Sequence, residues 1–420
     1  MTGSRDAGHN RGVEEDRGKL LAFPQAPEAI EMRHLRSFVA VAEDLNFGRA
    51  AARLYLSQPA LSRQISALER LVGCELLRRS THRVELTLAG EALLDRARRL
   101  LHDLDEAVSV TQSVGDELTA RLARFWKPLV EASNTEAPLE EMRAAYEALH
   151  AQFSLPPEAE VRPVNAGGVP SLLVGAQPDR PATLMHLHGG GYVLGSGFGY
   201  LPLAGALALA ADARAVVPEY RLAPEHPFPA AVEDARRVYA WMLDQGVDAQ
   251  QVTVAGDSSG GGLVISLLLT LKEQGLPLPG GALLLCPGVD LTGATLERRP
   301  PDEPVSAATL EQARRSADAY LAGHPIDDPV VSPLTADLSG LPPMLVQAAT
   351  GDFVLEDARR LTDRARSHGV DARLELYPVD THVFQLFWSF LPEAADALNQ
   401  AGRFARDVAS GASAGRSAGA

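Results

Sequence analysis

Apolar residues in the first part of the chain recur at helical spacing, interrupted by two short strand-like runs. From Arg33 onward, Leu35, Phe38 and Ala42 repeat every three to four positions, which predicts a helix. Ser57 is a good N-cap for a later helix, and Gly73 marks where that helix ends. The pattern predicts helices from residue 33, at 47–54 and at 57–72, and strands at 75–77 and 84–86.

A longer helix is expected next, capped by Thr87 and ending near Val114. At 1.5 Å per residue it would be roughly 40 Å long. One face carries an apolar stripe, so the helix needs a partner. We expect a homodimer to form through this linker helix; the alternative is that the stripe packs on the next domain of the same chain. The stripe consists of Leu93, Leu94, Ala97, Leu100, Leu101, Leu104 and Val108.

The remainder of the chain alternates between apolar runs of strand length and amphipathic stretches. Two amphipathic helices are expected at 122–130 and 139–153. After residue 161, strands alternate with helices such as 260–273 and 356–367, which predicts an α/β domain with a mostly parallel sheet. The expected strands include Val174 and the runs 183–187, 215–217, 251–255, 282–286, 344–348 and 373–377.

Length and composition indicate a multidomain globular protein. The chain has 420 residues, 46% of them apolar and 22% charged, which is too long for one ordinary core. No apolar run reaches the roughly 18 residues of a membrane span, and residues 1–31 lack the apolar region of a signal peptide. We therefore expect a cytoplasmic protein without a membrane partner. Cys74 and Cys286 have neither metal-site nor disulfide spacing, and both are expected in cores.

Charge is distributed unevenly along the chain, whose formal net charge is −15. Between Met32 and Arg99 there are twelve Arg and seven Asp or Glu, so this segment is basic and the remainder is strongly acidic. This distribution is expected of a nucleic-acid-binding head attached to a separate domain.

The helix predicted at 57–72 carries residue types that bind DNA bases. Glutamine can pair with adenine and arginine with guanine when a helix enters the major groove by its N-terminus. Arginines between the two short strands suit contacts to phosphate, which add affinity without sequence information. The candidate DNA-binding residues are Ser57, Gln58, Pro59, Ser62 and Arg63 on the helix, and Arg78, Arg79 and Arg83 at the tip of the strand pair, where Thr81 and His82 are also expected.

Motifs extend through this whole basic segment. They are Leu35-Arg36-Ser37-Phe38, Asn46-Phe47, Arg49-Ala50-Ala51, Ser57-Gln58-Pro59-Ala60-Leu61-Ser62-Arg63-Gln64-Ile65, Leu68-Glu69 and Leu86-Thr87-Leu88-Ala89-Gly90. Together they resemble the winged helix-turn-helix of LysR-type transcription regulators, which implies binding to double-stranded DNA. The rest of the chain departs from that family, which continues into a periplasmic-binding-protein-like effector domain. The alternative interpretation is that this unit only dimerises.

A serine between glycines follows one of the predicted strands. The run Gly256-Asp257-Ser258-Ser259-Gly260 lies between strand 251–255 and an apolar helix, as in a nucleophile elbow. Its glycines allow a strained turn that exposes the Ser258 hydroxyl. Upstream, His188-Gly189-Gly190-Gly191 ends another strand. The N–H groups of Gly189, Gly190 and Ser259 are expected to form an oxyanion hole.

Two further motifs accompany these, Tyr220-Arg221-Leu222-Ala223-Pro224-Glu225 and His382-Val383-Phe384. With them, residues 118–408 resemble the bacterial hormone-sensitive-lipase-like carboxylesterases of the α/β-hydrolase fold, and residues 117–155 resemble that family's helical cap. The family's acid motif matches Gly351-Asp352-Phe353-Val354-Leu355-Glu356-Asp357. The resemblance implies a triad of Ser258 as nucleophile, His382 as general base and then acid, and Asp352 as the group that orients the imidazole.

Other residues compete for these roles or depart from the family pattern. Glu356 and Asp357 are alternatives to Asp352, and His324 and His368 are alternatives to His382. No cofactor is expected, and no metal, because His186, His188 and His226 do not form a convincing metal site. The remaining candidates are Asp257, Glu225 and Asp290, interpreted as structural hydrogen-bonding groups, and Ser259 and Cys286, which stand where the family more often has alanine and serine.

The sequence thus predicts a multidomain protein: an all-α-rich winged helix-turn-helix joined to an α/β-hydrolase domain with a mostly parallel sheet and a helical cap. The expected function is a serine carboxylesterase for small esters, fused to a sequence-specific DNA-binding head. One alternative is a transcription regulator that senses an ester or acyl ligand, and another is an esterase that keeps the head only to dimerise. The expected segments are a disordered extension or over-extended gene start at 1–31, the DNA-binding domain at 32–91, the linker helix at 92–116, the hydrolase domain at 117–408 with its cap at 117–155, and a disordered tail at 409–420.

Overall fold

The computed structural model describes residues 30–79, 83–134, 137–176, 183–297 and 307–411. The chain divides into two compact units, Met1–Thr119, here called the head, and Ala120–Ala420, here called the body. Most of the segments 1–31 and 409–420, for which disorder is expected, lies outside the described residues, and so do the side chains of residues 105–116.

The head contains the predicted helices and strand pair. Phe38, Leu61 and Ile65 are fully buried in a core on which the helices pack. The Ser57 side chain accepts the Ala60 N–H, which confirms it as the cap of α3, and Gly73 ends that helix with φ 82°. The elements are α1 (Met32–Asp44), α2 (Phe47–Arg53), α3 (Gln58–Val72), β1 (Leu77–Arg79) and β2 (Val84–Leu86).

A single helix, α4 (Leu88–Asn134), replaces the two helices predicted for this region. Thr87 accepts the Gly90 N–H at 3.0 Å, so the predicted cap is confirmed. The predicted end near Val114 is wrong because the helix continues through Gly115. One glycine costs only about 1 kcal/mol in a helix and does not have to end it.

The apolar stripe on α4 has two environments. Its first part packs on the head's own core. The part that stays exposed is therefore shorter than the stripe that the sequence predicts. Leu100 and Leu104 are 55% and 36% exposed, while Val108 lies outside the described side chains. The stripe residues that belong to the head's core or pack against it are Leu93, Leu94, Ala97 and Leu101.

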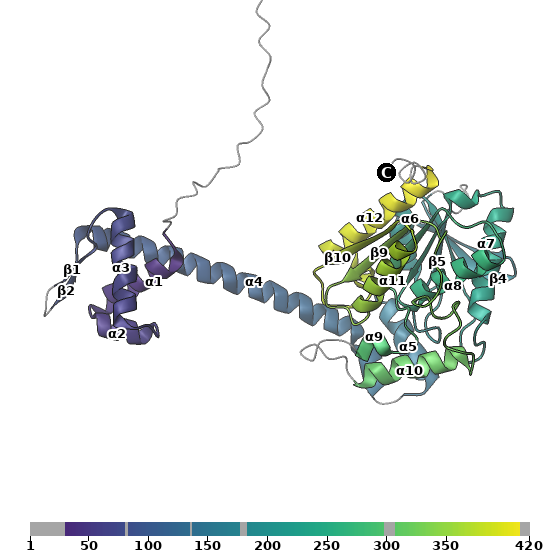
Figure 1. Cartoon of the computed structure of the whole chain (residues 1–420), viewed down its shortest axis with the longest axis horizontal. Helices are drawn as coiled ribbons and strands as arrows, with labels where there is room; N and C mark the ends of the chain where they lie inside the picture. The colour runs from purple at the N-terminus through teal and green to yellow at the C-terminus, as the bar shows by residue number, and fades with distance from the viewer. Residues whose placement is uncertain (1–29, 80–82, 135–136, 177–182, 298–306, 412–420) are drawn as a thin grey trace, which may run out of the picture. The chain divides into compact units, whose positions relative to one another are not determined.

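The body is built on a central sheet with the strand order β10-β9-β8-β7-β5-β6-β4-β3 (Figure 1). Strand β4 is antiparallel to both of its neighbours, and the other pairs are parallel, so the prediction of a mostly parallel sheet is confirmed. The strands are β3 (Glu160–Ala166), β4 (Val169–Gly175), β5 (Leu184–Leu187), β6 (Arg214–Pro218), β7 (Thr253–Asp257), β8 (Gly281–Leu285), β9 (Met344–Ala349) and β10 (Ala372–Tyr377).

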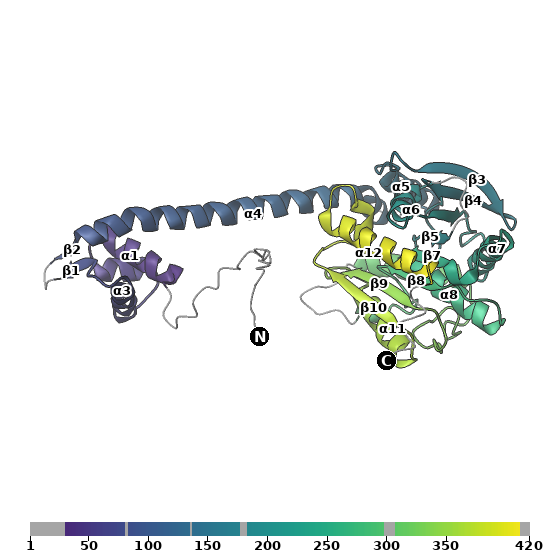
Figure 2. The same cartoon turned by 90° about the horizontal axis from the view of Figure 1, so that it is seen from above.

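Helices cover both faces of this sheet (Figures 1 and 2). Helices α6 and α12 contact each other on one face, and α7, α8 and α11 lie on the other. Helices α5, α9 and α10 lie beyond one end of the sheet (Figure 1). The bounds are α5 (Leu139–His150), α6 (Leu201–Ala210), α7 (Ala230–Asp244), α8 (Ser259–Glu273), α9 (Ala294–Glu297), α10 (Ala307–Leu321), α11 (Leu355–Ser367) and α12 (Pro392–Ala409), with short 3₁₀ turns at Ala249–Gln251 and Phe384–Phe387.

Two expectations drawn from composition have different outcomes. Cys286 is buried as expected, but Cys74 is exposed, because it lies in the turn just after α3 rather than on a core-facing element. Among the described helices, none combines the length and apolar character needed to cross a membrane.

Candidate active site and nucleic-acid interface

Ser258 occupies a strained turn between β7 and α8, with φ 50° and ψ −126°. A Cβ added to Gly256 would lie 2.4 Å from the Gly260 carbonyl oxygen, and one added to Gly260 would lie 2.1 Å from the Leu187 oxygen. Only glycine fits at these two positions. The Gly-x-Ser-x-Gly spacing is therefore the steric requirement of a tight turn that presents the Ser258 hydroxyl.

The three residues of the predicted triad lie in one hydrogen-bonded row. His382 Nε2 is 2.9 Å from Ser258 Oγ, and His382 Nδ1 is 2.9 Å from each carboxylate oxygen of Asp352. Ser258 follows β7, Asp352 follows β9 and His382 follows β10, so the carboxyl ends of parallel strands bring them together. Because Asp352 accepts the Nδ1 proton, Nε2 is left to accept the proton of Ser258.

The competing acids and bases are bonded to other groups, and so are Glu225 and Asp290, which the sequence analysis interprets as structural hydrogen-bonding groups. Asp352, unlike Glu356 and Asp357, reaches the imidazole of His382. The partners are Arg359 for Glu356, the backbone N–H groups of Val289 and Asp290 for Asp357, Asp328 for His324, Asp337 for His368, Arg143 for Glu225, and Thr292 and Thr295 for Asp290.

The three glycines after β5 direct their N–H groups differently. Gly189 donates to Asp257 Oδ1 at 3.2 Å, and Gly191 donates to Ser259 Oγ at 2.8 Å. Within the described part of the chain, the Gly190 N–H has no partner, and the Ser259 N–H opens the first turn of α8. Gly190 and Ser259 therefore remain the candidate oxyanion donors. The prediction for Gly189 is wrong, because a buried carboxylate takes its N–H.

Asp257 anchors this glycine loop from behind. Its carboxylate is fully buried and accepts the Tyr200 hydroxyl at 2.9 Å, while Tyr200 is hydrogen-bonded to Tyr146 of α5 at 2.7 Å. The His150 ring packs against Tyr200 in a tilted arrangement, with centroids 4.2 Å apart. Burial lowers the pKa of His150 to about 4, and it lowers the pKa of His188 to about 4 as well. These imidazoles are neutral at physiological pH, which agrees with a structural role for Asp257 and its neighbours.

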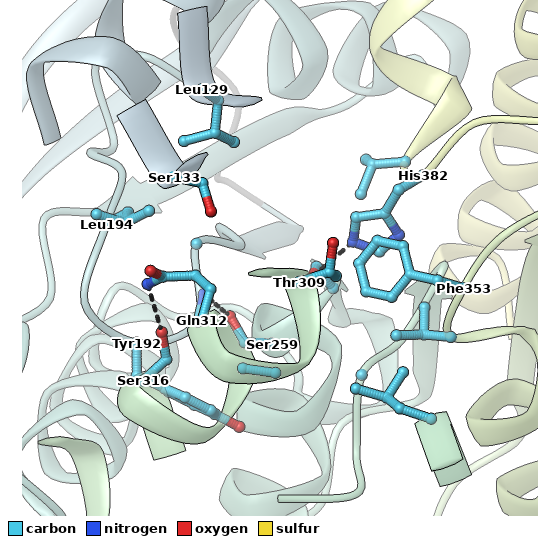
Figure 3. Close-up of a pocket in the computed structure, with 18 of the residues that line it drawn as sticks. Leu129, Ser133, Tyr192, Leu194, Ser259, Thr309, Gln312, Ser316, Phe353 and His382 are labelled. Atoms are coloured by element: carbon cyan, nitrogen blue, oxygen red, sulfur yellow. Dashed lines mark hydrogen bonds between the residues drawn. The ribbon is translucent and has the colours of Figure 1, made fainter. Parts of the chain in front are cut away.

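A cavity of about 500 Å³ opens over Ser258 (Figure 3). The last turns of α4 form part of its wall through Trp126, Leu129 and Ser133. Trp126 donates its indole N–H to Thr381 Oγ1 at 2.8 Å, next to His382, and Phe353 packs on the His382 ring with centroids 4.5 Å apart. Sequence analysis missed the contact of Trp126, since α4 belongs to no catalytic motif.

A group of possible metal ligands overlaps the row. The donor atoms of Cys286, Asp352 and His382 lie within 4.8 Å of one another. The hydrogen bonds of Asp352 and His382 account for the position of both groups. Burial raises the pKa of the Cys286 thiol, which favours the neutral thiol over the thiolate that binds metal.

The predicted DNA-facing residues of α3 lie on its solvent side. Ser57, Gln58, Pro59 and Arg63 are exposed and Ser62 is half-buried. The opposite face of the helix supplies the buried residues Leu61, Ile65 and Leu68. Candidate DNA-binding residues and core residues thus alternate along a single helix.

The predicted wing arginines have different environments. Arg78 and Arg79 lie within β1, so the prediction that they sit at the tip is wrong. Arg79 bonds to Glu69 at 2.5 Å and lies over the Phe47 ring, which ties it to the head. Arg83 is 79% exposed and pairs with Glu85 at 2.9 Å. Thr81 and His82 lie outside the described residues.

Comparisons with known proteins identify both units. The sequence model of the α/β hydrolase fold family matches residues 184–386, and that of the lysR family of bacterial regulatory helix-turn-helix proteins matches residues 32–91. An acetyl-hydrolase of Streptomyces hygroscopicus is 41% identical over 228 residues, which are 53% of this chain and 75% of the relative. An esterase of Acinetobacter venetianus is 33% identical over 268 residues, which are 64% and 88% of the two chains.

Solved structures agree with these relatives. The crystal structure of an esterase from the bacterial hormone-sensitive lipase family matches with a TM-score of 0.62 and 36% identity, and covers 68% of this chain and 98% of the other. An esterase/lipase from an uncultured bacterium matches with a TM-score of 0.61 and 34% identity. The match covers 67% of this chain and 99% of the other. The chain therefore belongs to the bacterial hormone-sensitive lipase family of α/β-hydrolase esterases, and is a carboxylic ester hydrolase with a lysR-family helix-turn-helix in its head.

Proposed function

We propose that the body hydrolyses small carboxylic esters through an acyl-enzyme formed on Ser258. The observation that supports this is the row in which His382 links Ser258 and Asp352 through hydrogen bonds of 2.9 Å. Ser258 Oγ attacks the ester carbonyl carbon and its proton passes to His382 Nε2. The Asp352 carboxylate stabilises the imidazolium that results.

The tetrahedral intermediate places a negative oxygen near the N–H groups of Gly190 and Ser259, which stabilise it. As it collapses, His382 gives its proton to the leaving alcohol and the acyl group remains on Ser258. Water then attacks the acyl-enzyme, with His382 again acting as base. The carboxylic acid leaves and Ser258 regains its proton.

Covalent labelling tests this mechanism. An organophosphate reacts with an activated serine, so the purified chain should gain one adduct on the peptide that contains Ser258, detected by mass spectrometry. The variant His382→Ala should lose most of the labelling, because Ser258 is then no longer activated. An adduct on another serine, or equal labelling of the His382→Ala variant, would contradict the proposal.

We also propose that the head binds specific DNA sequences through the exposed face of α3, in the cytoplasm and as a dimer. Exposed Gln58 and Arg63 support base contacts, and exposed Arg83 supports contact with phosphate. Selection from random duplex DNA with the full chain tests this part. A lack of enrichment over scrambled DNA at low salt would contradict the DNA-binding function and would not affect the proposed esterase activity.

A second candidate function is regulation of DNA binding by an ester or acyl ligand. It is favoured by one observation, namely that α4 belongs to both units and that its last turns line the cavity. A ligand that contacts Trp126 could thereby bias the head, and coupling of this kind is reciprocal between the two sites. The test is the DNA affinity of a Ser258→Ala variant with and without saturating ester. An unchanged DNA affinity would contradict regulation by the ligand.

A further inference from the structure

The cavity over Ser258 has walls of different polarity. Apolar side chains such as Leu129, Leu194 and Phe353 form much of it. One part instead carries hydrogen-bonding side chains from α10 and from the elbow, namely Gln312, Ser316 and Ser259, here called the polar row (Figure 3). The sequence motifs of the active site include only Ser259 of these three.

The polar row begins beside the nucleophile. Ser259 directly follows Ser258, and its Oγ accepts the Gly191 N–H at 2.8 Å. A Cβ on Gly191 would lie 3.1 Å from Ser316 Oγ, so Ser316 of α10 reaches the same glycine. Gln312, one helical turn before Ser316, donates its amide to Ser316 Oγ at 3.3 Å. Hydrogen-bonding groups therefore continue from the nucleophile along one side of the cavity.

Gln312 keeps hydrogen-bonding capacity on the cavity side. A glutamine amide offers two donor hydrogens and a carbonyl oxygen that accepts. The contact with Ser316 uses one donor, and no second partner for this amide is found within the described residues. A purely apolar ester that filled the cavity would remove water from these groups without replacing its hydrogen bonds. Leaving a polar group unpaired in this way opposes binding.

We propose that the enzyme prefers esters that carry a hydroxyl group near the scissile carbonyl, recognised by Gln312. This inference rests on the proposed esterase function. Sites built to hydrogen-bond a substrate hydroxyl discriminate strongly against the analogue that lacks it, because their own polar groups are then unpaired. The hydroxyl can belong to the acyl portion or to the alcohol portion of the ester.

Matched ester pairs test the preference. The acyl pair is p-nitrophenyl butyrate and p-nitrophenyl 3-hydroxybutyrate; the alcohol pair is butyl butyrate and 3-hydroxybutyl butyrate, followed by titration of the released acid. We expect the hydroxylated member of one pair to have a kcat/KM about tenfold higher, the effect of one net hydrogen bond. The pair that responds identifies which portion of the ester lies against Gln312.

The variant Gln312→Met keeps an unbranched side chain of similar length without the amide, and should bring the kcat/KM ratio of the responding pair to about one. Gln274→Met, at an exposed glutamine that ends α8, is the matched control and should leave the ratio unchanged. Equal rates within both pairs, or a preference that survives in Gln312→Met, would overturn the inference. If none of the four esters were hydrolysed, the result would instead contradict the proposed function.

Discussion

The head and the body build their sites in opposite ways. In the head, the candidate DNA-facing residues of α3 come from one short run, and the same helix supplies buried Leu61 and Ile65. In the body, Ser258 and His382 are 124 residues apart and meet only because strands β7 and β10 end at the same edge of the sheet. A site on one helix can be located from its periodicity, whereas a site assembled by a sheet requires the tertiary structure.

Helix α4 contributes side chains to both the head and the body. Near its start, Leu94 and Ala97 are buried in the head's core. Near its end, Trp126 lines the cavity and donates a hydrogen bond to Thr381, the residue before His382. An amphipathic stripe indicates only that a face will be covered, so its periodicity alone could not distinguish these contacts from dimerisation.

The largest expected effect concerns the body alone. Ser258→Ala should lower kcat for p-nitrophenyl butyrate by roughly 10⁴-fold or more, because the acyl-enzyme can no longer form. DNA binding, measured by fluorescence anisotropy, should be unchanged in the same variant, since Ser258 belongs to the body. Retention of a tenth of the activity would refute the role of Ser258.

Dimerisation should depend on the part of α4 that the head leaves exposed. Leu100→Glu combined with Leu104→Glu should convert a dimer to a monomer in sedimentation, with a loss of about 4 kcal/mol or more in association free energy. Leu276→Glu, which charges an exposed leucine of the body, is the control and should leave the dimer intact. A dimer that persists in the double variant would place the interface outside this part of α4.

Stability should depend on pH through buried His150. Its folded pKa is about 4 against an ordinary value of 6.5, so between these values the unfolded chain binds more protons and stability falls as pH falls. The loss at pH 5 relative to pH 7 should be about 2 kcal/mol smaller in His150→Phe, which removes the titrating group. Urea unfolding of the body transition measures this difference. Exposed His226→Phe is the control, and an equal pH dependence in His150→Phe would contradict the assignment.

Within the head, two arginines should respond differently. Arg63→Ala should weaken binding to the selected sequence by about 1–3 kcal/mol and relax its specificity, because the proposed base contact of this exposed side chain is lost. Arg79→Ala should chiefly lower the head's melting temperature, since this side chain bonds to Glu69 and covers Phe47. Loss of sequence specificity in Arg79→Ala, with the head still fully folded, would contradict the stabilising role given to Arg79.

Most of the fold could be predicted because its signals are local. Strand-length apolar runs and the Ser57 cap specified elements that the structure contains. The structure brings the motif residues Ser258, Asp352 and His382 together, but the motifs did not reveal which distant group each backbone N–H binds. Gly189 illustrates this, because its N–H points to Asp257, 68 residues away.

The sequence by itself determined the elbow at Ser258, whose flanking glycines are a steric demand of adjacent residues, and the separation of exposed and buried faces on α3, which follows from helical periodicity. Only the tertiary structure decided which N–H groups remain free for an oxyanion, that the end of α4 lines the cavity, and that Gln312 faces it. These depend on hydrogen bonds and packing between elements that are distant in sequence, and a local pattern carries no information about which distant group will be the partner.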